Sequence, residues 1–550
     1  MKKFFVMLMM TLMSLSLLGC GSDSAENANL KVMLGSNVVS LDTAEAVDQA
    51  SFEVIADCMD GLMQLDSDGK AIPAIAESFD VSEDGKKYTF HLRAAKWANG
   101  DEVTAEDFVF AWRRHCQNAD KYAYIMGSTV ANVKNADAVT KGADPKTLGV
   151  SAPDSKTFVV ELNSPVSFFP SLMAFPAFYP INEKFYNGLE KGSYGTSPET
   201  FLSNGAFVLT SYVPGSANIQ LKKNDTYWNA EKVSLDGFQY QVVSSSDNAL
   251  TAFKNGTMTV VEISGNQVQY VKNDPTLVKN LRVMPNGILY YVSFNQDPKN
   301  HHAGALSNVN LRLAISNAID RESIVNNYVM DGSEATYTAI PLQFAPHAET
   351  GKYFSDDQKQ FADYVGFDVD RARKYLATAK SELVKDNIEL NLIYANDGGE
   401  TIVKVVQAIK SQVEENLPGV VINLQPMPKA EYLNHITSNS YDLAVTNWAP
   451  DYDDPLTFFT LWTTEGSQIA EHWSNAEYDK LIADCTNGEL VTDYEARWQA
   501  LYDAEKILLE NAVIAPLYTN VTATLISDNV YGIDFHSVAM SRVFKSAVVK

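Results

Sequence analysis

The chain has 550 residues, of which 46% are hydrophobic and 20% are charged, a balance typical of a folded globular protein rather than a disordered one. This length exceeds what one hydrophobic core usually spans, so we expect two or three packed units. The 43 Lys and Arg against 68 Asp and Glu give a formal net charge of −25, which argues against a nucleic-acid-binding or anionic-membrane-binding surface.

The first nineteen residues are typical of an export signal. Lys2 and Lys3 precede an apolar run over 4–18, which at about 15 residues is shorter than the ~20 that a membrane-spanning helix needs. The run ends in Leu-Leu-Gly-Cys at Cys20, which resembles the bacterial lipobox, whose cysteine is lipidated and becomes the first mature residue. We therefore expect a lipid anchor on Cys20 and a flexible polar tether over 20–29. The alternative is an ordinary signal peptide that contains a cysteine.

Alternation of apolar and polar residues predicts strands at 88–93, 157–162, 289–294 and 388–393. Between the first two, Thr104-Ala-Glu-Asp107 is typical of a capping box that opens a helix, with Asp in place of the commoner Glu. The segment 97–101 just before it predicts a turn in which Gly100 adopts a positive φ.

The second half of the chain predicts an α/β arrangement. Apolar residues at helical spacing over 402–417 form one face of a helix that Pro418-Gly419 ends. With the strand at 388–393 and a strand at 420–424, this helix predicts a βαβ unit with parallel pairing. Helices are expected at 479–485 and 492–509, and without repeats or long linkers the units should be interleaved.

Signatures of catalysis and metal binding are absent from the sequence. It contains no HExxH, GxSxG or GxxxxGK[ST], and the pair His301-His302 has no third ligand at usable spacing. Asp453-Asp454 could serve glycoside hydrolysis, but loop carboxylates are more often solvated or capping groups. Cys58, Cys116 and Cys485 form no CxxC pair, and at least one of them must stay unpaired. Cys58 and Cys116 are interpreted as small buried hydrophobes. We expect no enzyme, cofactor or metal, with a surface-anchored hydrolase as the alternative.

A series of motifs runs in order from about residue 31 to residue 535: Ser40-Leu41-Asp42, Asp60-Gly61-Leu62, Ala74-Ile-Ala-Glu77-Ser78-Phe79, Lys96-Trp97-Ala98-Asn99-Gly100-Asp101, Thr104-Ala105-Glu106-Asp107-Phe108, Asn204-Gly205-Ala206-Phe207, Asn224-Asp225-Thr226-Tyr227-Trp228 and Asn310-Leu311-Arg312 through Asp320-Arg321. This series resembles family 5 of the bacterial solute-binding proteins, which feed oligopeptides, dipeptides or nickel to ABC importers, and the length favours the oligopeptide branch. We interpret most of these residues as scaffold. Arg321 is interpreted as a charge at a helix end.

The resemblance implies an α/β, two-lobed clamshell of the periplasmic-binding-protein type (type II, cluster C) with an inserted domain and a two-stranded hinge. Lobe I is expected to combine 30–58, 197–297 and 520–550. The inserted domain should cover 59–196, and lobe II should cover 298–519.

The resemblance also implies where a ligand would bind. The segment from Asn447 to Pro455, expected to follow a strand at 441–445, is similar to the family segment in which an aspartate receives a peptide α-ammonium. Asp451 is the matching position, and an ammonium taken out of water needs such a charge-assisted partner. The expected site residues are Asp451, Trp448, Asn447, Ala449, Tyr452, Asp48, Gln49, Ala50 and Tyr122.

Other interpretations of these residues stay open. Asp451 could only organise a turn, Trp448 could belong to the core, and the segments of Asp48 and Tyr122 could be plain loops. Val445 stands where some relatives have an arginine, so the group that binds a peptide carboxylate is undecided. The aromatic run over 168–180 is expected to be buried packing rather than a stacking platform.

The function that the resemblance implies is capture of oligopeptides outside the cytoplasm, through main-chain hydrogen bonds and hinge closure, for an ABC permease and its ATPase. We expect a monomer anchored to the membrane through Cys20. Alternatives are a binding protein for a sugar, haem or a nickel chelate, and a receptor for peptide pheromones.

Overall fold

The computed structural model describes residues 30–550 except 68, 119–121, 300–303, 348–349, 397–399, 465–471 and 539. The expected signal segment, Cys20, the tether and the pair His301-His302 lie outside the described residues. No helix in the described part of the chain is both long and apolar enough to cross a bilayer.

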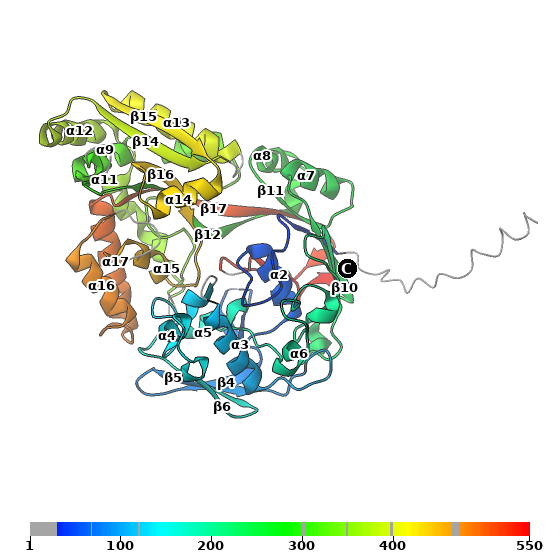
Figure 1. The fold of residues 1–550 in the computed structure, drawn as a ribbon. Helices are drawn as coiled ribbons and strands as arrows, with labels where there is room; N and C mark the ends of the chain where they lie inside the picture. Colours follow the sequence, from blue (N-terminus) through cyan, green and yellow to red (C-terminus); the bar gives the residue numbers. More distant parts are fainter. Residues whose placement is uncertain are drawn as a thin grey trace, which may run out of the picture.

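A mixed sheet of eleven strands runs through the molecule (Figure 1). Its order is β15-β14-β16-β12-β17-β11-β1-β10-β9-β8, and β13 pairs with β17 beside this path. The strands are β1 (Lys31–Leu34), β8 (Phe207–Ser211), β9 (Asn218–Lys223), β10 (Gly237–Val242), β11 (Val260–Ile263), β12 (Leu281–Phe294), β13 (Glu334–Ala335), β14 (Ile388–Ala395), β15 (Val420–Met427), β16 (Leu443–Trp448) and β17 (Ile514–Ile526).

The antiparallel strands β12 and β17 connect two hydrophobic cores. One end of the pair contributes Val292 and Leu517 to a core with the β14–β16 strands, and the other end contributes Leu525 to a core with β11 and its helices. Between the two ends the register of pairing shifts between Pro285 and Leu289. Two cores joined by two strands confirm the expected two-lobed α/β fold, with the irregular stretch of β12 lying between the lobes.

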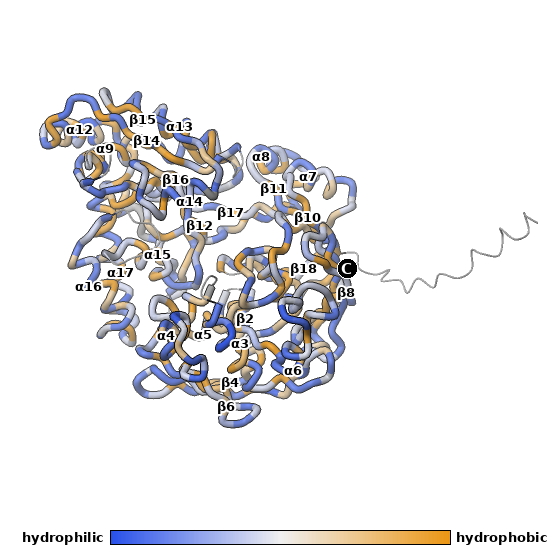
Figure 2. The backbone as a smooth tube through the Cα atoms, viewed as in Figure 1, coloured by the Kyte–Doolittle hydropathy of each residue, from blue (hydrophilic) through white to orange (hydrophobic). Residues whose placement is uncertain are grey.

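The lobe of β14–β16 contains the predicted βαβ unit. β14 and β15 pair in parallel from Ile388↔Val420 to Ala395↔Met427, and the helix between them ends at Asn416, just before Pro418-Gly419. Apolar residues of this helix, α13, and of both strands belong to one buried core, and Figure 2 shows hydrophobic positions in orange along these elements. The helices of this lobe are α9 (Val309–Asn317), α10 (Arg321–Ile324), α11 (Ala362–Val365), α12 (Val369–Leu383), α13 (Glu400–Asn416), α14 (Lys429–Thr437), α15 (Leu456–Phe459), α16 (Ala476–Thr486) and α17 (Tyr494–Glu510).

A separate four-stranded antiparallel sheet, in the order β4-β5-β7-β6, lies within the expected inserted domain, whose boundaries stay a prediction. We call this region the small-sheet unit; its elements are β2 (Met63–Leu65), β3 (Ala71–Pro73), β4 (Ala76–Val81), β5 (Lys87–Leu92), α3 (Ala105–Gln117), α4 (Ala136–Thr140), β6 (Val150–Asp154), β7 (Thr157–Glu161), α5 (Phe169–Leu172) and α6 (Glu183–Asn187). The other lobe adds α2 (Gln49–Cys58), α7 (Ser246–Lys254), α8 (Asn266–Asn273) and the pairs β18 (Val530–Tyr531) with β21 (Val548–Val549) and β19 (Asp534–Phe535) with β20 (Arg542–Val543).

The capping box predicted before α3 forms, and its aspartate has a second role. Asp107 accepts the backbone N–H of Thr104 and also the indole N–H of Trp97, each at 3.0 Å. The predicted turn is confirmed as well, since Gly100 has a φ of +91°. The Asp107 side chain of this motif therefore caps the start of α3 and also binds the indole of Trp97, which is fully buried.

One expectation about individual residues changes. The strand expected at 441–445 is β16, which continues to Trp448, so Asn447 and Trp448 lie within a strand and not after it. Arg321 is at a helix end, as expected, since it is the first residue of α10. It is 1% exposed, and its side chain donates to the backbone oxygens of Pro516, Ser316 and Ile319. Cys58, Cys116 and Cys485 are buried and free, and burial was expected for Cys58 and Cys116.

Candidate functional site

A cavity of about 220 Å³ lies where the two lobes meet. At roughly 30 Å³ per water molecule, this space corresponds to about seven waters. It has four walls: the start of α2 together with Phe175 of the small-sheet unit, the irregular stretch of the β12–β17 pair, the loop after β16, and the turn between β19 and β20. They are distant in sequence, so the cavity exists only in the folded chain.

The first wall comes from α2. Asp48 caps the helix by accepting the backbone N–H of Ser51 at 3.0 Å, so its carboxylate is used locally and does not line the cavity. Gln49 and Phe52, three residues apart on one helix face, do line it. Phe175 of the small-sheet unit packs on Phe52 with ring centroids 5.0 Å apart and extends this apolar side.

The second wall is the irregular stretch between the lobes, where Asn286, Ile288 and Thr522 line the cavity. The side-chain oxygen Oδ1 of Asn286 accepts the backbone N–H of Ile288 at 3.2 Å. Gly287 between them has a φ of +73°, which only glycine adopts without strain. This bulge turns two polar side chains and one apolar side chain of the strand pair towards the cavity.

The third wall is the loop after β16, with Ala449, Pro450 and Asp451. The backbone N–H of Asp451 donates to Oγ1 of Thr457 at 3.0 Å. Further along, Asp454 pairs with Arg497 at 2.7 Å, and both side chains are almost fully buried. Burial and the neighbouring Asp454 raise the pKa of Asp453 to about 6. These contacts make Asp453-Asp454 part of the loop's scaffold.

The fourth wall is the turn between β19 and β20, which contributes His536, Ser537, Val538, Met540 and Ser541. Burial lowers the pKa of His536 to about 4, so its imidazole is neutral at neutral pH. Such a ring can donate or accept a hydrogen bond without adding charge.

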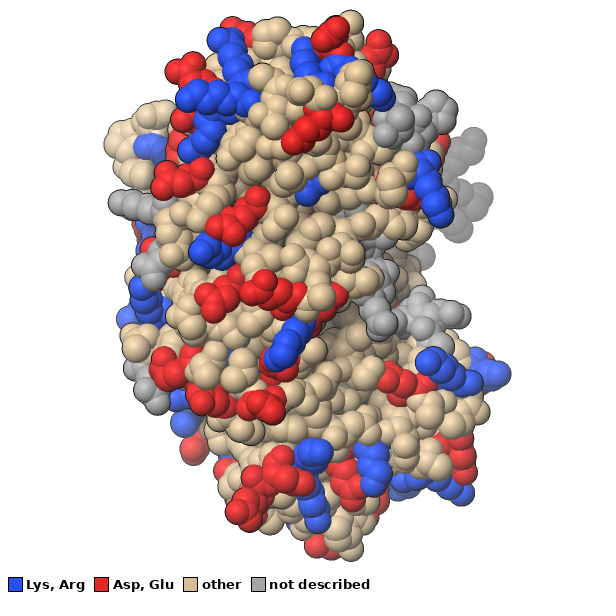
Figure 3. Space-filling model, turned by 90° about the vertical axis from the view of Figure 1, so that its left-hand side faces the viewer, with Lys and Arg blue, Asp and Glu red and all other residues tan. Residues whose placement is uncertain are grey.

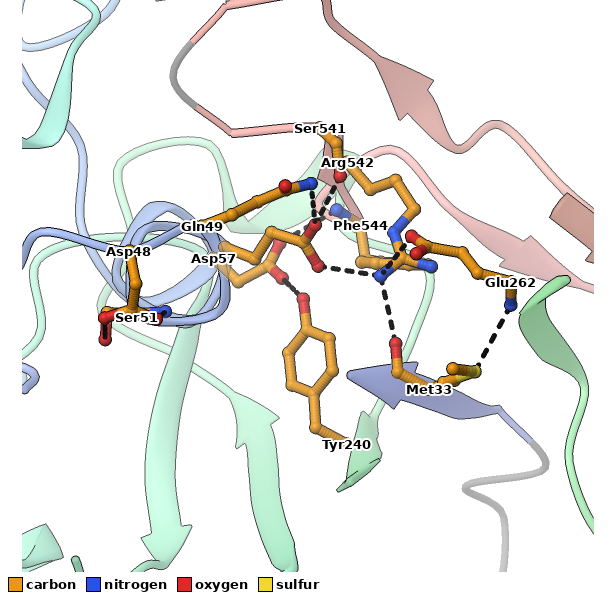
Figure 4. A network of polar contacts seen from close by, with 11 residues as sticks. Met33, Asp48, Gln49, Ser51, Asp57, Tyr240, Glu262, Ser541, Arg542 and Phe544 are labelled. Carbon is orange, nitrogen blue, oxygen red and sulfur yellow. Dashed lines mark hydrogen bonds and ion pairs between the residues drawn. The ribbon is translucent and has the colours of Figure 1, made fainter. Parts of the chain in front are cut away.

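Behind Gln49 and Ser541 lies a buried ionic network (Figure 4). Both side chains donate to Oε1 of Glu53, while Arg542 contacts Oε2 of Glu53 at 3.0 Å and Glu262 at 3.2 Å. Burial raises the pKa of Glu53, and Arg542 opposes this shift. Arg542 is thus engaged by two carboxylates and by the carbonyl of Met33.

Asp451 is the one acidic residue among the described residues that line the cavity, and the others have neutral hydrogen-bonding groups or apolar side chains. No Lys or Arg is among the described residues that line the cavity. This composition suits a cationic group beside a chain of amides, because amide, hydroxyl and imidazole groups can pair with main-chain N–H and C=O. In the described part of the chain, no group of three or more His, Cys, Asp or Glu residues could hold a metal ion.

The structure brings together three of the expected site residues, Asp451, Ala449 and Gln49. Ala50 is buried in α2, Asn447 is exposed on β16, and Trp448 is half-buried against the core. Tyr452 is buried, and Tyr122 begins the short 3₁₀ helix Tyr122–Met126. Ala50, Asn447, Trp448, Tyr452 and Asp48 are not among the residues that line the cavity. The part of these residues and of Tyr122 in ligand binding stays a prediction.

Sequence reasoning missed Phe175, Asn286, Thr522, His536 and Ser541. Phe175 belongs to the run 168–180, where the expected burial is confirmed for most aromatic rings. Of these five residues, only Asn286 could have been found from the sequence, because Pro285-Asn286-Gly287 interrupts the strand pattern where a bulge occurs. On the face of the molecule in Figure 3, acidic and basic side chains are interspersed, so no patch of one charge suggests a further binding site there.

Comparison with known proteins gives a consistent result. Residues 70–469 match the family described as bacterial extracellular solute-binding proteins, family 5 Middle. The dipeptide-binding protein of Lactococcus lactis subsp. cremoris is 29% identical over 97% of this chain and 96% of its own length.

Two solved structures are similar over almost the whole chain. The substrate-binding domain of an oligopeptide ABC transporter from Bacillus anthracis has a TM-score of 0.76 and 33% identity, covering 95% of this chain and 98% of its own. Listeria monocytogenes OppA bound to peptide has a TM-score of 0.75 and 30% identity, covering 95% and 99%.

Proposed function

Because the chain belongs to family 5 of the bacterial extracellular solute-binding proteins, we propose that it captures oligopeptides outside the cytoplasm for an ABC importer. Members of this family are binding proteins of transport systems and not enzymes. The observation that carries the choice of peptide is the position of Asp451: a carboxylate at an interlobe cavity whose other lining groups are neutral.

In this proposal Asp451 pairs with the α-ammonium of the peptide. An ammonium removed from water loses hydration, and a carboxylate at hydrogen-bond distance offsets that loss. Gln49, Asn286, Thr522 and Ser541 bind main-chain groups, which are common to all peptides. Binding then depends little on side-chain identity, as an oligopeptide receptor requires.

Closure follows from the architecture. The cavity takes residues from both lobes, so a ligand that contacts all four walls stabilises the closed arrangement over an open one. The β12–β17 pair, irregular at Asn286–Ile288, supplies the hinge. We further propose that the closed monomer is recognised by a permease, and that a lipid on Cys20 holds it at the membrane.

The direct experiment is native mass spectrometry of the protein purified from its host, followed by sequencing of whatever co-purifies. Short peptides of mixed sequence are the expected cargo. A carbohydrate, haem or metal chelate in their place would contradict the proposal. Incubation with synthetic peptides separates a receptor from a hydrolase, since a receptor returns its ligand uncleaved.

A further inference from the structure

A stacked aromatic pair connects the small-sheet unit to the loop that carries Asp451. The rings of Phe168 and Tyr452 lie 4.2 Å apart between centroids, with an angle of 6° between their planes. Tyr452 is 4% exposed and directly follows Asp451 in the chain. The contact therefore acts on the residue next to the cavity carboxylate.

A polar contact between the same two regions lies nearby. The side-chain oxygen of Asn487, just after α16, accepts from the Asn132 amide at 3.0 Å and from the Ser164 hydroxyl at 2.6 Å. Asn132 is buried and also accepts from the Asn163 amide at 3.0 Å. Phe168, Asn132 and Asn487 line one small cavity, so the aromatic and polar contacts form one interface.

Within its own lobe the loop that carries Asp451 is held by the Asp454–Arg497 pair and by the bond from Asp451 to Thr457. Both of these contacts can persist whatever the relative position of the small-sheet unit. The stack of Phe168 on Tyr452 exists only when the small-sheet unit and the α15–α17 region are together, and the ligand cavity likewise takes Phe175 from the small-sheet unit and Asp451 from the loop before α15.

We infer that Phe168 is a positioning residue for ligand binding: it stacks on Tyr452, holds the Asp451 loop in place and favours the closed arrangement, with Asn487 supporting the same interface. The role in ligand binding rests on the proposed function, whereas the effect on the loop does not. Phe168 does not line the ligand cavity itself.

The first test is hydrogen exchange of residues 449–457 in the purified protein, measured by mass spectrometry. Phe168→Ala and Asn487→Ala should speed exchange of this segment, and Phe168→Tyr, which keeps the stack, should not. The matched control is Phe79→Ala, because Phe79 is also half-buried and its ring contacts in the described part of the chain, both tilted, are with Tyr88 and Phe90 of its own sheet.

The second test uses tri-alanine and N-acetyl-tri-alanine in isothermal titration calorimetry. Phe168→Ala should raise the Kd of tri-alanine about three- to tenfold, in line with the contribution of one aromatic pair. Its preference for the free amine over the acetylated peptide should also fall, because a displaced Asp451 no longer meets the ammonium. General loss of packing would weaken both peptides equally.

The outcomes are separable. Unchanged exchange in Phe168→Ala relative to Phe79→Ala would overturn the inference, and so would faster exchange with an unchanged free-amine preference. If the wild-type protein binds neither peptide, the proposed function fails for tripeptides, while hydrogen exchange still decides whether Phe168 holds the loop.

Discussion

Gly287 of β12 approaches Pro450 so closely that a Cβ atom at position 287 would lie 2.8 Å from Cγ of Pro450. The same atom would lie 2.8 Å from the backbone oxygen of Ser537. Three of the four cavity walls therefore converge on one residue without a side chain. The lobes can approach each other this closely because residue 287 has no side chain.

Gly287→Ala should weaken peptide binding about tenfold and lower stability, because the methyl group would separate the β16 loop from β12. The positive φ alone costs roughly 1–2 kcal/mol for a residue with a Cβ. Gly256→Ala is the matched control, with a φ of +69° and nothing within 4 Å of its Cβ. Thermal unfolding should show a larger loss of stability in Gly287→Ala than in Gly256→Ala, because only the former adds a steric clash to the positive φ. Calorimetric titration should show lost affinity in Gly287→Ala alone, and equal affinities would contradict the prediction.

Asp451→Asn should weaken the binding of free-amine peptides by about a hundredfold or more, since loss of a partner from a desolvated charge pair costs roughly 2–5 kcal/mol. N-acetylated peptides should lose little, because they bring no ammonium. Titration with both forms of one tripeptide measures the difference, and Glu83→Gln, an exposed carboxylate in a turn of the small-sheet unit, is the control. Equal weakening of both forms would count against the assigned role.

Glu505 should make stability pH-dependent. Its carboxyl is fully buried and accepts the backbone N–H of Ala339 at 2.7 Å, and burial raises its pKa from 4.5 to about 8. The folded state therefore keeps a proton that the unfolded state releases above pH 4.5. The unfolding free energy should fall as pH rises towards about 8, by up to about 1.4 kcal/mol per pH unit from this group.

Urea unfolding of the wild type and Glu505→Gln between pH 5 and about 8 tests this effect. The amide cannot ionise, so the variant should lose less stability than the wild type across that range. Parallel pH profiles for the two proteins would show that Glu505 is ionised in the folded state.

Arg497→Met should destabilise the protein by about 3–5 kcal/mol, because it leaves the Asp454 carboxylate buried without its partner. The double variant Asp454→Asn/Arg497→Met should lose less, since the asparagine oxygen can still accept the backbone N–H of Leu456. Chemical unfolding of the two variants gives the comparison. A single variant no less stable than the double variant would disprove a charge effect.

The features that sequence predicted well are those set by nearby residues. The capping box at Thr104 and the helix stop at Pro418-Gly419 depend on contacts within a few positions, so the pattern is sufficient. The end predicted for the strand β16 was wrong, because the polar residues Thr446 and Asn447 suggested a loop. Their backbones nevertheless pair with Tyr291 and Tyr290 of β12. A strand ends where its partner ends, and the partner is distant in sequence.

The sequence by itself determined the family, the α/β class and the loop of Asp451, because ordered motifs and local periodicity are written in consecutive residues. Only the tertiary structure decided that Gln49, Asn286, Thr522 and His536 share a cavity with that aspartate, and that Phe168 stacks beside it. The reason is physical: packing and charge act between neighbours in space, and these neighbours come together only when the β12–β17 pair joins the two lobes.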